Sequence, residues 1–157
     1  MSDRTVTHST FVIERTYAAS PARVFSAWAT PAFKARWFAC HDDWQPSLFE
    51  LDFRVGGRER LHTGPAGGPV HAFNGVYQDI VPDRRIVWTY DMHLDAQRIS
   101  VSLATVELHR EGTGTRLVFT EQGAFLDGLA SAKEREEGTR IQLDNLEAAL
   151  RQPLASA

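Results

Sequence analysis

Residues 15–31 read RTYAASPARVFSAWATP and contain two helix starts in close succession. Ser20-Pro21 combines a favoured N-cap residue with a proline that fits the first helical position. Thr30-Pro31 repeats this signal, which predicts a second short helix directly after the first. Residues 10–17 are rich in β-branched and aromatic side chains and predict a strand. The sequence therefore predicts a strand followed by two short helices in series.

The middle of the chain changes to a period of two. Phe49, Leu51, Phe53 and Val55 alternate with charged residues, which is the pattern of a half-buried strand that ends at a glycine turn. Similar runs between turn residues predict strands over residues 49–55, 58–63, 70–81, 85–93, 99–109 and 115–122. Strands that follow one another through short turns pair as hairpins, so we expect one antiparallel sheet.

The last part of the chain is helical in character from about residue 127 to residue 152. Three leucines recur at helical spacing and mark its buried face: Leu143, Leu146 and Leu150. Residues 134–137 are all charged and predict a solvent-facing turn of this helix. Gly138 predicts either a break or close packing, because glycine inside a helix costs about 1 kcal/mol relative to alanine. Together with the strands, this helix makes an α+β domain.

Five blocks of the sequence resemble the blocks of one known family, in the same order. They are RTYAASPARVFSAWATP (15–31) with RWF (36–38), LDFRVGGR (51–58), GVYQDIVPDRRIVWTY (75–90), GTRLVFTEQG (114–123) and EGTRIQLDNLEAAL (137–150). Over about residues 10–150 the chain resembles the family related to the heat-shock-protein-90 ATPase activator, within the START-like (SRPBCC, birch-pollen-allergen-type) superfamily. This resemblance implies a helix-grip fold, in which a curved antiparallel sheet wraps a long C-terminal helix and leaves a cavity between them.

Two positions depart from the pattern of that family. The closing helix usually carries tryptophan after its glycine, but here that residue is Thr139, which should enlarge the end of the cavity or let water into it. The strand after the glycine turn is usually apolar at alternate positions, but here the first of these is Glu59. The family name also implies a chaperone partner and a role in the stress response. The eukaryotic co-chaperone has an additional N-terminal domain for which 157 residues leave no room, which argues against that partner.

Composition limits the class of protein. Hydrophobic residues make up 43% and charged residues 24% of the chain, which is enough apolar surface for one core. We expect a single domain over residues 10–152, with a flexible N-terminus (1–9) and a C-terminal tail (153–157). A net charge of −3 argues against a nucleic-acid partner, and no stretch has the roughly 20 apolar residues of a membrane span. With one cysteine and no secretory signal, the sequence favours a cytoplasmic location.

Strand parity predicts which side chains face the cavity. Continuing the parity of Phe53 across the turn places Glu59 on the concave side, and the parity of Phe119 places Glu121 there. Burial raises the pKa of a carboxyl group, and this is the setting in which an acid or base is tuned. The alternative is that each carboxylate pairs with an arginine or lies at the wet mouth of the cavity.

No metal or cofactor is expected. The histidines show neither HxH nor HExxH spacing, and His41-Asp42-Asp43 is interpreted as an ordinary acidic loop. Cys40 is interpreted as structural, because neighbours in a loop rarely reach the geometry of a nucleophile and its base. The glycine pairs at 56–57 and 67–68 predict turns and not phosphate loops.

Three functions remain. They are binding of a small hydrophobic or aromatic molecule, polyketide-cyclase or dehydratase chemistry using Glu59 or Glu121, and interaction with a chaperone. Binding without chemistry is favoured, because the cavity follows from the fold whereas catalysis needs a constellation that the sequence does not show. The oligomeric state is left open, with a homodimer as one alternative. The expected ligand-binding residues are Trp37, Phe38, Phe53, Leu61, Tyr77, Trp88, Tyr90, Phe119, Glu121, Thr139 and Leu143.

Overall fold

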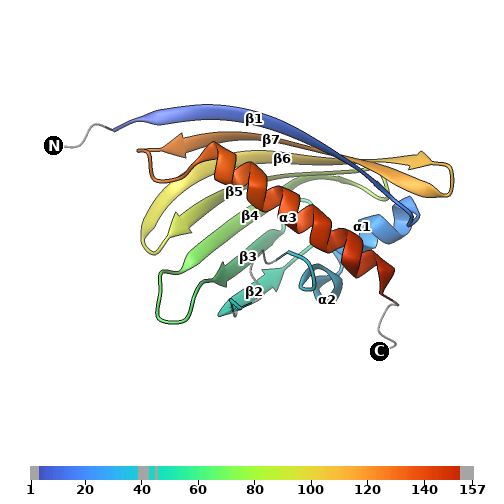
Figure 1. Ribbon diagram of the computed structural model, residues 1–157, viewed down its shortest axis with the longest axis horizontal. Coiled ribbons are helices and arrows are strands. Elements are labelled where there is room, and N and C mark those ends of the chain that lie inside the picture. Colours follow the sequence, from blue (N-terminus) through green and yellow to red (C-terminus); the bar gives the residue numbers. More distant parts are fainter. Residues whose placement is uncertain (1–3, 39–42, 45, 153–157) are drawn as a thin grey trace.

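A curved antiparallel sheet bends around a long C-terminal helix (Figure 1). The computed structural model describes residues 4–38, 43–44 and 46–152. Its elements are β1 (Val6–Tyr17), α1 (Pro21–Ala29), α2 (Pro31–Lys34), β2 (Leu48–Leu51), β3 (Arg58–Thr63), β4 (His71–Val81), β5 (Arg85–Leu94), β6 (Gln97–Glu111), β7 (Gly114–Leu126) and α3 (Ala132–Arg151). The described residues form a seven-stranded sheet in the order β1-β7-β6-β5-β4-β3-β2. This arrangement confirms the predicted helix-grip fold.

The sheet is a run of hairpins to which the first strand has been added at the far edge. β2 to β7 pair in chain order, each with the next. β1 instead pairs along its whole length with β7, from Val6 opposite Leu126 to Tyr17 opposite Thr115. β1 begins at Val6, a little before the predicted residue 10, because the ladder with β7 continues to its end.

The two short helices begin where the sequence predicts. The Ser20 side chain accepts a hydrogen bond from the Arg23 backbone N–H at 3.2 Å, and Pro21 occupies the first turn. The Arg23 guanidinium then donates to the carbonyl oxygens of Leu150 at 2.9 Å and Gln152 at 2.7 Å. These bonds satisfy carbonyls at the end of α3 that have no partner within the helix. Arg23 therefore fastens α1 to the C-terminal end of α3.

The predicted strand over 49–55 is shorter in the structure. β2 ends at Leu51, and Val55 is exposed and not on the concave face. A tight turn replaces the second half, in which Arg54 N–H bonds the carbonyl of Asp52 at 3.0 Å and Gly57 N–H bonds that of Arg54 at 2.8 Å. A Cβ atom on Gly57 would lie 2.0 Å from the Asp52 carbonyl oxygen, so only glycine permits this turn. The alternating sequence pattern therefore extends beyond the end of the strand.

The predicted helix over 127–152 begins later. Asp127 and Gly128 have φ values of 56° and 67°, a left-handed conformation that a right-handed helix cannot continue. Ser131 follows as the N-cap and accepts a hydrogen bond from the first turn of α3, which begins at Ala132. Past this point α3 is continuous, and the break that Gly138 suggested is absent from these described residues.

α3 lays its apolar side against the concave face of the sheet. Leu143 and Leu146 are buried and Leu150 is half-buried, which confirms the predicted face. The Tyr17 hydroxyl of β1 donates to the Leu143 carbonyl at 3.0 Å and joins the far edge of the sheet to the helix. Among the described residues, no helix combines the length and apolar character needed to span a bilayer.

Candidate functional site

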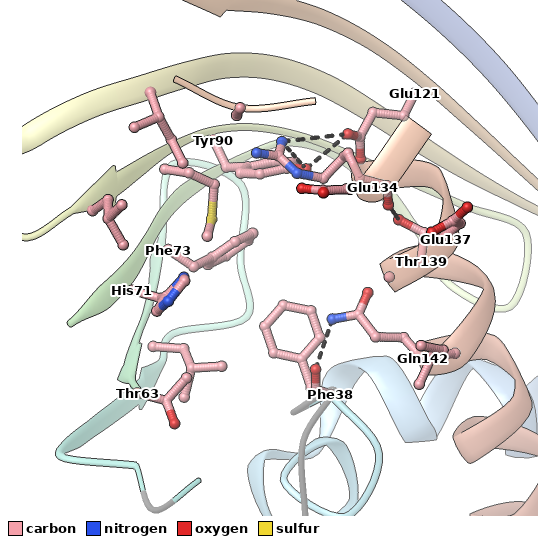
Figure 2. A pocket seen from close by; sticks show the side chains of 18 of the residues that line it. Phe38, Thr63, His71, Phe73, Tyr90, Glu121, Glu134, Glu137, Thr139 and Gln142 are labelled. Carbon is pink, nitrogen blue, oxygen red and sulfur yellow. Dashed lines mark hydrogen bonds and ion pairs between the residues drawn. The ribbon is translucent and has the colours of Figure 1, made fainter. Parts of the chain in front are cut away.

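A cavity of about 620 Å³ lies between α3 and the concave face of the sheet. Its lining is mostly apolar, with a smaller set of polar side chains, most of them on α3 and the others on β3, β4, β7 and the residue before α3 (Figure 2). The apolar lining consists of Trp28, Phe38, Trp44, Leu61, Phe73, Trp88, Tyr90, Met92, Leu94, Ile99, Phe119, Leu129, Ala130 and Ile141. The polar lining consists of Thr63, His71, Glu121, Ser131, Glu134, Arg135, Glu137, Thr139 and Gln142.

Aromatic rings form the wall opposite α3. Phe73 of β4 stacks on Tyr90 of β5 with ring centroids 4.6 Å apart, and Phe38 meets Phe73 edge-on at 5.2 Å. Farther along the cavity, the ring centroids of Trp28 on α1 and Trp88 on β5 are 5.5 Å apart. Rings held at these distances and angles are fixed by mutual packing. They offer flat apolar surfaces to any molecule that enters.

The polar end of the cavity is a hydrogen-bonded cluster, which we call the Arg135 cluster: Ser100, Ser102, Tyr90, Glu121 and Arg135. The Tyr90 hydroxyl donates to Glu121 Oε2 at 2.8 Å, and Arg135 Nη1 donates to the Tyr90 hydroxyl at 3.1 Å. Arg135 also donates to Ser102 Oγ at 3.5 Å and to Ser100 Oγ at 2.8 Å. Glu121 and Arg135 approach to 3.8 Å, an ion-pair distance. Strands β5, β6 and β7 thus meet α3 through one buried polar network.

Burial controls the titration of this cluster. The Glu121 side chain is 2% exposed, and loss of hydration raises its pKa, although Arg135 and the hydrogen bonds from Tyr90 and Ser102 pull the pKa down. Burial likewise raises the pKa of Tyr90, with the neighbouring Glu121 charge adding to the rise. Tyr90 therefore stays a neutral hydroxyl, and Glu121 takes up a proton more readily than an ordinary glutamate does.

The side of the cavity farther from the Arg135 cluster is framed by α3 and by the end of α2. Gln142 of α3 donates through Nε2 to the Phe38 carbonyl at 2.6 Å, which holds the helix to the segment after α2 (Figure 2). Across the space from Gln142 lie Thr63 and His71 on β3 and β4. The ring of His71 is 4.7 Å from that of Trp44.

Seven of the eleven predicted ligand-binding residues line the cavity: Phe38, Leu61, Trp88, Tyr90, Phe119, Glu121 and Thr139. The other four, Trp37, Phe53, Tyr77 and Leu143, are not among its lining residues. Trp37 is 1% exposed and donates through Nε1 to the Ala27 carbonyl at 3.0 Å, so it serves the core behind the cavity. Strand parity predicts on which face of the sheet a side chain lies, and it did so correctly. It does not predict which side chains on that face are covered by α1 and α2 and so do not reach the cavity.

Glu59 faces inward as predicted, yet it lies in a separate buried cluster and does not line the cavity. Lys34 Nζ is 2.6 Å from Glu59 Oε1, and the Tyr77 hydroxyl donates to the same oxygen. Both charged side chains are 2% exposed. This pairing is the structural alternative raised for the carboxylate, with a lysine in place of an arginine. Glu59 is therefore no longer a candidate acid or base for a ligand in the cavity.

No group of three His, Cys, Asp or Glu side chains suitable for a metal ion occurs within the described ranges. Cys40, His41 and Asp42 lie outside these ranges. The sequence reading missed Arg135, because residues 134–137 look like a charged outer turn. The available signal was spacing: Arg135 precedes Thr139 and Leu143 at four-residue intervals and so shares their buried face.

A curved antiparallel sheet that grips a C-terminal helix, with an apolar cavity between them, defines a START-like protein. Within that class, the family model described as "Activator of Hsp90 ATPase homolog 1-like protein" matches residues 18–151. The chain belongs to this family, which confirms the resemblance found in the sequence blocks.

Solved structures of similar proteins carry the same fold. A protein from Rhizobium leguminosarum is 49% identical with a TM-score of 0.92, and the match covers 96% of this chain and 99% of that one. The Mll3558 protein from Rhizobium loti is 52% identical with a TM-score of 0.86, covering 92% and 99%. An AHSA1-like protein from Aeromonas hydrophila, at 21% identity, TM-score 0.68 and coverage of 95% and 100%, shares the fold. No curated protein matches this chain.

Proposed function

We propose that this protein binds a small hydrophobic or aromatic molecule in the cavity between the sheet and α3. The observation that carries the proposal is the cavity itself: about 620 Å³, walled by aromatic rings, with one buried polar cluster at its end. Small-molecule sites typically have this size and combine apolar walls with a few fixed polar groups. The apolar walls would supply most of the affinity, and the Arg135 cluster would orient the molecule.

Binding is tested by titrating the protein with fluorescent apolar probes. Trp28 and Trp88 line the cavity, so an occupant should quench or shift tryptophan emission. A ligand at 100 times its Kd should also stabilise the fold by about 2.7 kcal/mol, which raises the melting temperature. If a broad panel of apolar probes shows no saturable binding, the proposal is wrong.

A bulky substitution that fills the cavity tests whether the probe binds there. Thr139 is buried on α3 and lines the cavity at the position where the family resemblance implies a tryptophan. Thr139→Trp should therefore weaken probe binding while the fold remains intact. Ala148→Trp adds the same ring at an exposed position of α3 and serves as the matched control. Equal binding by the two variants would place the probe outside this cavity.

A second function, acid–base catalysis of the polyketide-cyclase or dehydratase kind, is favoured by one observation. Glu121 lies in the cavity, its pKa is raised by burial, and a second titratable group, Tyr90, is hydrogen-bonded to it. A carboxyl group tuned in this way can exchange a proton with a bound molecule. Mass spectrometry of recovered ligands distinguishes the two functions, because a binder returns its ligand unchanged. Turnover that survives in Glu121→Gln would remove this carboxylate from any mechanism.

A further inference from the structure

Arg135 directs its hydrogen bonds to uncharged oxygens. Nη1 donates to the hydroxyls of Tyr90 and Ser102, and Nη2 donates to that of Ser100. Glu121 lies 3.8 Å away, beyond hydrogen-bond distance, and its oxygen is instead bonded by Tyr90. A guanidinium bonds ionised oxygens more strongly than neutral ones, so a carboxylate within hydrogen-bond distance would be a stronger acceptor than the hydroxyls that Arg135 now contacts.

The guanidinium is fixed in position before any ligand arrives. Its side chain is 15% exposed, and its central carbon lies 5.7 Å from the ring centroid of Tyr90 and 5.3 Å from that of Phe125. The two serine hydroxyls that it contacts are themselves buried. Arg135 also belongs to the first turn of α3, where the helix dipole favours negative charge. A preorganised donor of this kind gains affinity because little side-chain motion is lost on binding.

Three carboxyl groups line the cavity near this site and must be compatible with an anion. Glu134 and Glu137 are exposed on α3, where water and salt screen their charge. Glu121 is buried, but its raised pKa lets it take up a proton when a second negative charge comes close. A protonated Glu121 would become a hydrogen-bond donor to the incoming oxygen. The cluster can therefore receive an ionised oxygen beside Arg135.

The geometry points to an organic acid as the ligand, with its apolar, ring-sized body against Phe73 and Trp88 and its carboxylate bound by Arg135. This inference rests on the proposed binding function and adds the chemical class of the ligand. Phe73 and Trp88 line the same cavity as Tyr90, Glu121 and Arg135 of the cluster, so a single molecule can contact both groups.

Two probes with the same ring system test the inference: 2-naphthoate and its neutral amide, 2-naphthamide. Isothermal titration of the wild-type protein at pH 7 should show about 10- to 100-fold tighter binding of the acid, the range expected for hydrogen bonds to a charged group. Arg135→Met should reduce acid binding to the level of the amide and change amide binding little. Arg140→Met is the matched control, because Arg140 lies on the outer side of α3 and pairs with Glu136.

Each outcome of these titrations either supports or overturns the organic-acid inference. If the amide binds as tightly as the acid, or tighter, the organic-acid inference is overturned while the binding function stands. If neither naphthyl probe binds but neutral apolar probes do, the inference again fails alone; if no apolar probe binds, both fail. Should Arg135→Met not fold, Arg135→Lys keeps the charge without the planar fork and should retain part of the acid preference. An unchanged acid-to-amide ratio in a folded Arg135 variant would also overturn the inference.

Discussion

Replacing Lys34 with methionine should destabilise this protein far more than the loss of a surface lysine. Lys34 Nζ is 2.6 Å from Glu59, and both side chains are 2% exposed. Within the described chain the other carboxylate oxygen, Oε2, has no hydrogen-bond partner. Without the ammonium group, Glu59 would be a buried carboxylate held by the Tyr77 hydroxyl alone. The variant therefore removes one half of a pair that compensates for the burial of both charges.

The expected cost follows from this geometry. Removing one partner of a buried ion pair costs about 3–5 kcal/mol. For a protein of this length each 1 kcal/mol lowers the melting temperature by about 2–4 °C, which gives a drop of about 6–20 °C. Four rings add to the loss, because they lie 4.4–6.0 Å from Nζ: Trp28, Trp37, Phe38 and Trp88. Burial also lowers the pKa of Lys34, so the ammonium form depends on Glu59 beside it.

Urea unfolding of four proteins measures the effect: wild type, Lys34→Met, Glu59→Gln and the double variant. The double variant leaves no unpaired charge, so it should recover at least about 2 kcal/mol of the summed single costs. Lys133→Met, at an exposed position of α3, is the control for loss of a lysine and should cost less than about 0.5 kcal/mol. The reasoning is refuted if Lys34→Met costs less than about 1 kcal/mol or if the two single costs simply add.

Two further predictions concern the grip of the helix and the buried acid. Leu146→Ala should cost about 2–5 kcal/mol in urea melts, because this side chain of α3 is fully buried. Ile141→Ala, at a 44% exposed position, should cost less than about 1 kcal/mol, and equal costs would contradict the grip. Burial raises the pKa of Glu121 above 4.5, so the folded protein holds this proton more tightly than the unfolded chain does. Stability should therefore fall as pH rises above 4.5, and Glu121→Gln should flatten that fall; parallel stability curves would exclude this role.

The fold was predictable because its signals are local. The Ser20-Pro21 pair marks the start of α1 without any distant contact, and the two-residue period fixes which side chains of a strand share a face. The bounds that differed depend on backbone geometry that side-chain patterns do not encode. Val55 continues the alternation of β2, yet the turn around Gly57 has already ended the strand.

The site was less predictable because its key groups depend on partners far away in the chain. Lys34 follows a helix start and looks like an ordinary surface lysine until β3 brings Glu59 beside it. Arg135 lies among acidic residues, and its inward partners on three strands, the hydroxyls of Tyr90, Ser100 and Ser102 and the carboxyl group of Glu121, explain why it turns inward. The inward-facing glutamates could be predicted because strand parity is a local property of the sequence. Their counter-ions could not be predicted, because they come from distant parts of the chain.

The pairing of β1 with β7 also governs how this chain can be assembled during synthesis. Val6 pairs with Leu126, so β1, the first of these strands to be synthesised, can find its neighbour only after β7 has been made. Until β7 emerges, β1 has no partner and β6 presents an unsatisfied edge, the condition under which strands join other chains. Such long-range pairing closes slowly, because the entropy of a large loop must be lost before its contacts form. α3 follows β7 directly, so the segment that completes the core leaves the ribosome soon after the strand that pairs with β1.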